Sequence, residues 1–235
     1  MAGTLYLIPT PLGDSPLNTV LPEETRAVAR RLRHFVVEQA KTARAFLKQV
    51  GTELPIQQLH LAELNEHTRA EALAALLAPL LDGHDVGLLS EAGCPAVADP
   101  GANLVRLAHR HGITVKPLVG PSSILLALMA SGLVGQRFAF HGYLPAKPEA
   151  RAKAIRELEA RAQKEDAAQA FIETPYRNTA LLDTLLSVCR PDTLLSVAVD
   201  LTTAEEFIRT QPVIDWRKAL PNLDKRPTVF LLWRA

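Results

Sequence analysis

The chain is poor in cysteine and has no long apolar run. Its 235 residues include two cysteines, Cys94 and Cys189, which lie far apart and form no CxxC or Cys/His pattern. This spacing argues against a disulfide scaffold and against a structural zinc site, so we expect no metal. The longest apolar stretch, residues 124–130, is far shorter than the roughly 20 residues that span a bilayer.

No charge of one sign dominates. Lys and Arg number 26 against 25 Asp and Glu, for a formal net charge of +1. No global field therefore attracts nucleic acid or membrane, although a local basic face is compatible with this total. The N-terminal MAGTLYLIPTPLGD has no basic segment and only a short apolar run, so it does not resemble a signal peptide. We expect a cytoplasmic protein with no membrane partner.

Several common catalytic motifs are also missing. The sequence contains no GxGxxG after its first apolar run, no GxxxxGK[ST], no GxSxG and no HExxH. These absences disfavour an ordinary dinucleotide site, a P-loop NTPase, an α/β-hydrolase and a zinc protease.

Short apolar runs alternate with helix-forming segments along the whole chain. Strands are predicted at 5–8, 35–37, 59–61, 86–89, 113–118, 138–140, 170–173, 194–199 and 229–232. Helices are predicted at 25–33, 42–50, 68–81, 103–111, 122–129, 150–164 and 178–188, and the charged stretch 154–170 is interpreted as a solvated helix face. This alternation is typical of α/β proteins with a mostly parallel sheet. We expect an N-terminal α/β domain over 1–118 and a C-terminal α/β domain over 119–235.

Three loops follow predicted strands, where ligands of open α/β sheets bind. The first, PTPLGD at 9–14, is stiffened by two prolines, and Gly13 allows a close backbone approach. The second, SEAGCPAVADPG at 90–101, is too long and too rich in small residues for a routine connection. The third, GPSS at 120–123, opens a helix that a serine can cap.

These loops, with FHGYLPAK and IETPYRN in the second half, resemble the tetrapyrrole methylase superfamily of S-adenosylmethionine-dependent methyltransferases. Within it the chain is most similar to the ribosomal RNA small-subunit methyltransferase I family, which methylates a ribose 2′-hydroxyl in 16S ribosomal RNA. The resemblance implies a two-domain α/β fold, with a mostly parallel sheet in the first domain, a mixed sheet in the second and the cofactor cleft between them. It also implies S-adenosylmethionine as cofactor, RNA of the small ribosomal subunit as partner, and a homodimer.

The resemblance also implies which residues touch the cofactor. Positions carried over from the family are Leu12, Gly13, Cys94 and Val97 in the first domain, and Ser122, Ser123, Ile124 and Phe171 toward the second. Contacts in the first domain are expected mainly through loop backbone, whereas Phe171 is expected to form an apolar wall.

A ribose hydroxyl is a weak nucleophile that benefits from a general base. Carboxylates on the loops are Asp14, Glu38, Glu66, Glu91, Asp99 and Glu173. We favour Asp14, Glu38 and Glu66 as catalytic residues, because they lie on first-domain loops where a substrate would enter. A basic rim for RNA phosphates is expected from Lys41, Arg44, Lys48, Lys147, Arg151, Lys153 and Arg177. Aromatic residues are only 5% of the chain, so no base-stacking platform is expected.

The segments expected to meet the substrate depart from the family pattern more than the cofactor loops do. The family's acidic-Asp-Thr-Arg segment stands here as Glu38-Gln39-Ala40-Lys41, and its Lys-Gly-Glu segment as Lys225-Arg226-Pro227. Two alternatives therefore stay open beside the RNA enzyme. One is a methyltransferase of the same fold acting on a tetrapyrrole-like small molecule, and the other is a non-catalytic S-adenosylmethionine-binding module.

Overall fold

The computed structural model describes residues 2–65, 68 and 70–234. The chain divides into two compact units, Met1–Ser122 and Ser123–Ala235, each with its own sheet and core. The division falls shortly after residue 118, where the sequence places the domain boundary. No helix in the described part of the chain is long and apolar enough to cross a membrane.

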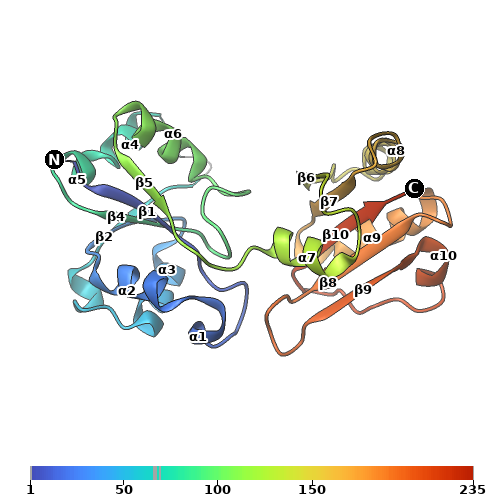
Figure 1. The fold of residues 1–235 in the computed structure, drawn as a ribbon, viewed down its shortest axis with the longest axis horizontal. Helices are drawn as coiled ribbons and strands as arrows, with labels where there is room; N and C mark the ends of the chain where they lie inside the picture. Colours follow the sequence, from blue (N-terminus) through green and yellow to red (C-terminus); the bar gives the residue numbers. More distant parts are fainter. Residues whose placement is uncertain (1, 66–67, 69, 235) are drawn as a thin grey trace. The chain divides into compact units, whose positions relative to one another are not determined.

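The first unit is built on a five-stranded sheet in the order β3-β2-β4-β1-β5, whose neighbouring strands all run parallel (Figure 1). The strands are β1 (Thr4–Ile8), β2 (His34–Val37), β3 (His60–Glu63), β4 (Val86–Leu89) and β5 (Thr114–Pro117). The helices are α1 (Leu17–Val20), α2 (Glu23–Arg31), α3 (Ala40–Val50), the 3-10 turn η1 (Ile56–Gln58), α4 (Ala70–Ala75), α5 (Ala78–Leu81) and α6 (Ala102–Arg110). The mostly parallel sheet expected for this half is confirmed.

Both faces of the three central strands, β1, β2 and β4, are buried, which explains why these strands are nearly continuous apolar runs. Successive side chains of a strand point to opposite faces. Tyr6 and Ile8 accordingly pack in one apolar cluster with residues of α2 and α3. Leu5 packs in another cluster with residues of α5 and α6.

The predicted continuous helix over 68–81 is wrong. The segment forms two short helices, α4 and α5, separated by a turn at Leu76 and Leu77. In that turn the N–H groups of Leu76 and Leu77 donate to carbonyls three residues back. Pro79 has no N–H to donate to a carbonyl one turn earlier and occupies the first turn of α5, so the amphipathic pattern continues across a break in the helix.

The second unit has a mixed sheet in the order β6-β7-β10-β8-β9, as expected from the sequence. The strands are β6 (Phe138–Tyr143), β7 (Ala168–Ile172), β8 (Leu194–Val199), β9 (Phe207–Pro212) and β10 (Thr228–Trp233). The helices are α7 (Ser123–Ser131), α8 (Pro148–Glu165), the 3-10 turn η2 (Pro175–Arg177), α9 (Asn178–Val188) and α10 (Val213–Trp216). β6 and β7 run parallel, whereas the other neighbours are antiparallel. The sequence missed β9, an edge strand with no continuous apolar run.

The core of the second unit includes residues of α8, α9, α10 and the sheet. The rings of Phe171 and Phe230 stack with centroids 6.0 Å apart. Trp216 is fully buried, and its indole Nε1 donates to the carbonyl of Leu195 at 2.9 Å. Its large ring is therefore both packed and hydrogen-bonded, as buried tryptophans require.

The interpretation of 154–170 as a solvated helix face needs correction. Ile155, Leu158 and Ala162 of α8 are buried in the core, and so is the carboxylate-bearing Glu159. Glu159 Oε1 accepts hydrogen bonds from the Thr193 hydroxyl and, at 2.8 Å, from the Arg190 N–H. The burial of one stripe arises because helix α8 packs against β7 and β10, which composition alone does not reveal.

Replacing Glu159 by Ala is expected to lower the free energy of unfolding by about 1–3 kcal/mol, because the Arg190 N–H loses its partner and the buried Thr193 hydroxyl loses its acceptor. Chemical denaturation of the full chain measures this. The matched control is Glu157→Ala on the exposed face of the same helix, expected to change stability by less than about 0.5 kcal/mol. Equal losses in both variants would show that the buried carboxylate contributes nothing specific.

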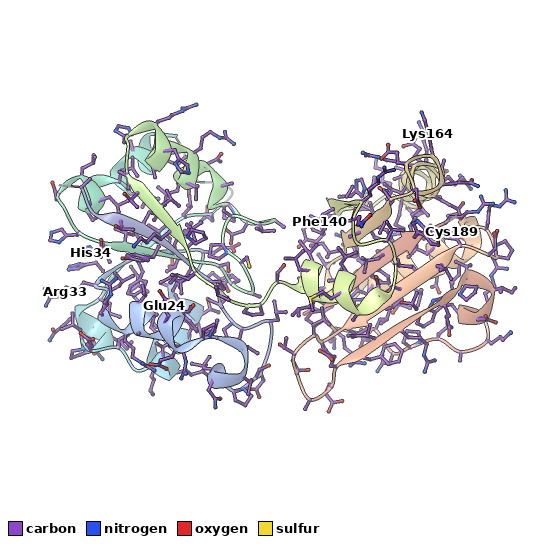
Figure 2. The ribbon with its side chains drawn as sticks, viewed as in Figure 1. Glu24, Arg33, His34, Phe140, Lys164 and Cys189 are labelled. Carbon is purple, nitrogen blue, oxygen red and sulfur yellow. The ribbon has the colours of Figure 1, made fainter. Side chains whose placement is uncertain are left out.

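Three imidazoles stack along the amino edge of the first unit's sheet. His34, labelled in Figure 2, begins β2 and lies opposite His60 of β3. Its ring stacks on those of His60 and His84, with centroids 4.8 Å and 5.0 Å away. Burial lowers the pKa of His34, and the neighbouring His60, His84 and Arg33 lower it further.

The stack predicts a loss of stability in acid. Below the ordinary histidine pKa, His34 is protonated in the unfolded chain but stays largely neutral in the folded chain. The unfolded state then binds more protons, so the free energy of unfolding falls as pH falls. Urea unfolding between pH 8 and pH 5 is expected to show this loss, with a flatter profile in His34→Gln. The control His109→Gln, on the exposed side of α6, is expected to keep the wild-type profile. A His34→Gln profile as steep as wild type would contradict the assignment.

Candidate functional site

Two of the three loops are joined at the carboxyl edge of the first unit's sheet. Because β1 and β4 are neighbours, the loops that follow them lie side by side. Thr10 and Gly93 pair through two backbone hydrogen bonds, each 3.0 Å long. The Thr10 hydroxyl donates to the Ser90 carbonyl at 3.2 Å, and the Ser90 hydroxyl donates to the Gly93 carbonyl at 2.7 Å. The two loops therefore form one hydrogen-bonded element.

The third loop packs against the first two. The Thr25 hydroxyl donates to the Val119 carbonyl at 2.7 Å, and the Cys94 thiol lies 3.4 Å from the Pro121 carbonyl oxygen. A Cβ at Gly120 would stand 2.4 Å from the Cβ of Pro9, which is too close for any side chain. Gly120 is therefore required by the approach of the first loop.

The loop after β4 holds unusual backbone. Ala96 and Ala98 have φ angles of 65° and 55°, a left-handed conformation that costs a non-glycine residue about 1–2 kcal/mol. Asp99 Oδ1 accepts hydrogen bonds from the N–H groups of Ala96 at 3.2 Å and Gly101 at 2.8 Å. Burial raises the pKa of the Asp99 carboxyl, and these two hydrogen bonds oppose the rise. Strained backbone held in this way is typical of ligand-binding loops.

The structure places the four cofactor residues expected in the first unit on the joined loops that follow β1 and β4. Leu12 is half-buried, and its Cδ2 lies 3.1 Å from where a Cβ on Gly93 would stand. Gly13 and Val97 are exposed on the loops. Burial raises the pKa of the Cys94 thiol, which disfavours the nucleophilic thiolate. The joined loops therefore present small residues, an exposed apolar side chain and turned backbone.

The other expected cofactor residues are placed differently. Ser122 ends the first unit, and Ser123 and Ile124 begin α7 in the second; all three are half-buried. Phe171 lies in β7, where the core encloses its ring completely. Its side chain has no exposed surface in the second unit.

A cavity of about 310 Å³ opens beside the joined loops, lined by residues of the 10–15 loop, α3 and the 89–91 segment. Asp14 and Glu91 supply its two carboxylates. Glu91 Oε1 accepts a hydrogen bond from the Thr42 hydroxyl at 2.7 Å, which ties the loop after β4 to α3. The cavity therefore combines hydrogen-bond acceptors with an apolar wall that includes Phe46.

Of the three favoured catalytic carboxylates, the structure describes Asp14 and Glu38. Asp14 lines the cavity and is exposed. Glu38 follows β2 at the same edge of the sheet and is half-buried. Glu66 lies outside the described residues. Glu91, which we did not favour, lines the cavity with Asp14, and its position directly after β4 and Ser90 is the signal that would have found it.

The remaining loop carboxylates have structural partners. Asp99 supports the strained loop, whereas Glu173 is buried in the second unit and accepts a hydrogen bond from Arg177 Nη2 at 2.7 Å. Within the described residues no group of three His, Cys, Asp or Glu side chains is arranged to hold a metal ion.

Comparison with known proteins identifies the fold and the family. The family model "Tetrapyrrole (Corrin/Porphyrin) Methylases" matches residues 4–214. Two solved structures share the fold. The methyltransferase CobJ has a TM-score of 0.66 and 22% sequence identity, and the match covers 100% of this chain and 95% of that one. Uroporphyrin-III-C-methyltransferase from Thermus thermophilus has a TM-score of 0.56 and 21% sequence identity, and the match covers 99% of this chain and 93% of that one.

Curated relatives cover the chain from end to end. Ribosomal RNA small subunit methyltransferase I of Pseudomonas aeruginosa is 32% identical over 100% of this chain and 80% of its own length. The protein of the same name from Xylella fastidiosa is 34% identical over 88% of this chain and 71% of its own length. The resemblance inferred from the loop motifs is thereby confirmed. The chain belongs to the tetrapyrrole methylase family, and it is a methyltransferase of a kind that in general depends on S-adenosylmethionine.

Proposed function

We propose that this protein transfers a methyl group from S-adenosylmethionine to a ribose 2′-hydroxyl of small-subunit ribosomal RNA. The observation that carries this proposal is the similarity, over the full chain, to proteins named ribosomal RNA small subunit methyltransferase I. Similarity to the tetrapyrrole enzymes is only 22% and 21%, so it supports the fold and not their substrates. A small-molecule acceptor and a non-catalytic module are kept as outcomes of the test.

S-adenosylmethionine supplies an electrophilic methyl group on a positively charged sulfur. We assign its binding to Leu12, Gly13, Cys94, Val97, Ser122, Ser123 and Ile124, and to the backbone of Phe171, whose ring is enclosed by the core. The support comes from the loop backbone around Gly93, where Leu12 and Cys94 converge. Methyl transfer from a sulfonium neutralises charge, so positioning of the acceptor by these loops supplies much of the acceleration.

Asp14 is our first choice of base among Asp14, Glu38 and Glu66. It lies on the loop that follows β1 and lines the cavity beside the joined loops. A carboxylate there would take the proton of the ribose 2′-hydroxyl, whose oxygen would gain the methyl group while the electron pair of the methyl–sulfur bond stays on the sulfur.

We further propose that the enzyme works as a homodimer in the cytoplasm, with domains at 1–118 and 119–235. The support for a dimer is α7, whose sequence SILLALMAS is apolar on all sides. Met129 of this helix is 79% exposed, and Leu125 is exposed as well. A helix apolar all round is normally covered, so a second copy of the chain is the proposed cover.

The central test supplies the purified protein with S-adenosylmethionine carrying a labelled methyl group and with small ribosomal subunits from a strain lacking the gene. Calorimetric titration with S-adenosylmethionine is run on the same preparation. We expect binding, and label on a ribose 2′-oxygen of the ribosomal RNA. Binding without label in RNA would overturn the RNA assignment in favour of a small-molecule acceptor or a non-catalytic module, and absence of binding would refute cofactor use.

The base assignment predicts that Asp14→Asn lowers kcat by about 10²–10⁴-fold, because the amide cannot take the proton. Cofactor affinity is expected to stay at the wild-type value. The matched control is Asp82→Asn, in the exposed turn that follows α5, expected to keep full activity. Wild-type kcat in Asp14→Asn would exclude Asp14 as the base.

A further inference from the structure

Two exposed tyrosines gather at one edge of the second unit. Tyr143 ends β6 and lies opposite Ile172, the last residue of the parallel strand β7. Tyr176 follows four residues after Ile172, in η2. Their exposed fractions are 60% and 78%, although the chain has only three tyrosines in all. Tyrosines are typically enriched where a partner covers the ring.

A rigidly held arginine lies next to Tyr176. Arg177 Nη2 donates to Glu173 Oε1 at 2.7 Å, and this oxygen also accepts from the Thr174 N–H at 2.7 Å. The Glu173 side chain is fully buried, whereas that of Arg177 is 44% exposed. A guanidinium has five N–H groups, so this bond to Glu173 leaves donors free to face solvent. Because the buried carboxylate already fixes the guanidinium, little conformational entropy remains to be lost when an anion binds.

The exposed charges near the two tyrosines favour a partner that carries phosphate groups over a positively charged partner. Lys147 is exposed where it caps α8, four residues after Tyr143. Glu149 in the first turn of α8 is the opposing exposed charge, while Glu173 is buried against Arg177. The segments that carry the two tyrosines therefore hold two cations, Lys147 and Arg177, and one exposed carboxylate, Glu149. Farther along the same edge, Asp200 is paired with Arg226 at 2.6 Å. Another residue of the expected basic rim, Arg151, is buried and donates to the Thr184 hydroxyl at 3.0 Å, so it is not part of this surface.

We propose that Tyr143, Tyr176 and Arg177 form a docking surface for single-stranded RNA. The tyrosine rings stack on unpaired bases, and the guanidinium of Arg177 binds a neighbouring phosphate. Stacking tolerates every base and phosphate contacts carry no sequence, so this surface supplies affinity and orientation. An acidic peptide would satisfy the cations but would leave the flat ring faces without a matching partner. The inference deepens the proposed function, since it rests on RNA as the substrate.

The proposed surface differs from the expectation, based on low aromatic content, that the chain has no stacking platform. Composition gives the number of aromatic residues but not their exposure. Two tyrosines suffice when the parallel pairing of β6 and β7 brings the ends of both strands to the same edge.

The test measures binding of a fluorescein-labelled, unstructured ten-nucleotide RNA to the full chain by fluorescence anisotropy. Tyr143→Ala and Tyr176→Ala are each expected to raise Kd by about five- to a hundredfold, the usual effect of losing one stacked base. The matched variants Tyr143→Phe and Tyr176→Phe keep the ring face and are expected to stay within about twofold of wild type. Arg177→Gln is expected to reduce the slope of log Kd against log salt concentration by about 1.

The charge control is Lys164→Ala. Lys164 lies in the last turn of α8, at the end away from Lys147, and is labelled in Figure 2. This variant is expected to bind the RNA as wild type does. Arg177→Gln removes the charged partner of Glu173 and leaves the Thr174 N–H, so it is the variant most prone to misfolding. The variants of the exposed tyrosines test the proposal if Arg177→Gln fails to fold.

Three results would overturn the inference: no binding of the RNA by wild type, wild-type binding in both tyrosine-to-alanine variants, or equal losses in the phenylalanine and alanine variants. Tyrosine-dependent binding of an acidic ten-residue peptide, with no effect on RNA, would assign the surface to a protein partner instead. Methyl transfer to small subunits is measured on the same variants. If the tyrosine-to-alanine variants methylate small subunits as wild type does, the docking surface is rejected and the proposed function stands. If wild type binds the RNA through the tyrosines but transfers no methyl group, the proposed function is rejected and the surface stands.

Discussion

The strand order of the first unit is the constraint on which the candidate site depends. Because β1 lies between β4 and β5, the loops that follow these three strands are neighbours. The first loop nevertheless lies 80 residues before the second in the sequence, counted from Thr10 to Ser90, and still farther before the third. The two hydrogen bonds between Thr10 and Gly93 then join the first two loops into a single element. Gly120 is fitted against Pro9 so closely that no side chain is tolerated. The surface proposed to bind the cofactor is therefore a consequence of sheet order and of very small residues.

The same element holds its strain locally. Left-handed backbone at Ala96 and Ala98 is supported by the carboxylate of Asp99, and the Thr42–Glu91 hydrogen bond ties the loop to α3. Such cross-links keep small, apolar, turned backbone in place without a glycine-rich phosphate cradle. A cofactor without phosphate groups requires no such cradle, which agrees with the missing dinucleotide motif.

The second unit uses buried charge in a different way. Glu159 and Glu173 are both buried carboxylates with hydrogen-bond donors at short range. Glu159 ties α8 to the turn before β8. Glu173 instead pairs with Arg177, whose side chain is partly exposed to solvent. Arg226, in one segment that departs from the family pattern, also has a partner within this unit, since its Nε donates to Asp200 Oδ2 at 2.6 Å. This ion pair ties the segment before β10 to the turn after β8.

Local patterns in the chain were enough to predict the parallel first sheet, the mixed second sheet, most strands and the family, because apolar runs and loop motifs are short-range signals. Long-range packing decided the rest. Pro79 broke a helix whose amphipathic pattern continued, and the edge strand β9 carried no apolar run to reveal it. The burial of Glu159 and of the Phe171 ring, the pairing of Asp14 with Glu91 at one cavity, and the shared edge of Tyr143 and Tyr176 all depend on which strands and helices become neighbours. Residues distant in sequence become neighbours only when the sheet assembles, and the spacing of apolar residues along the chain carries no information about such long-range contacts.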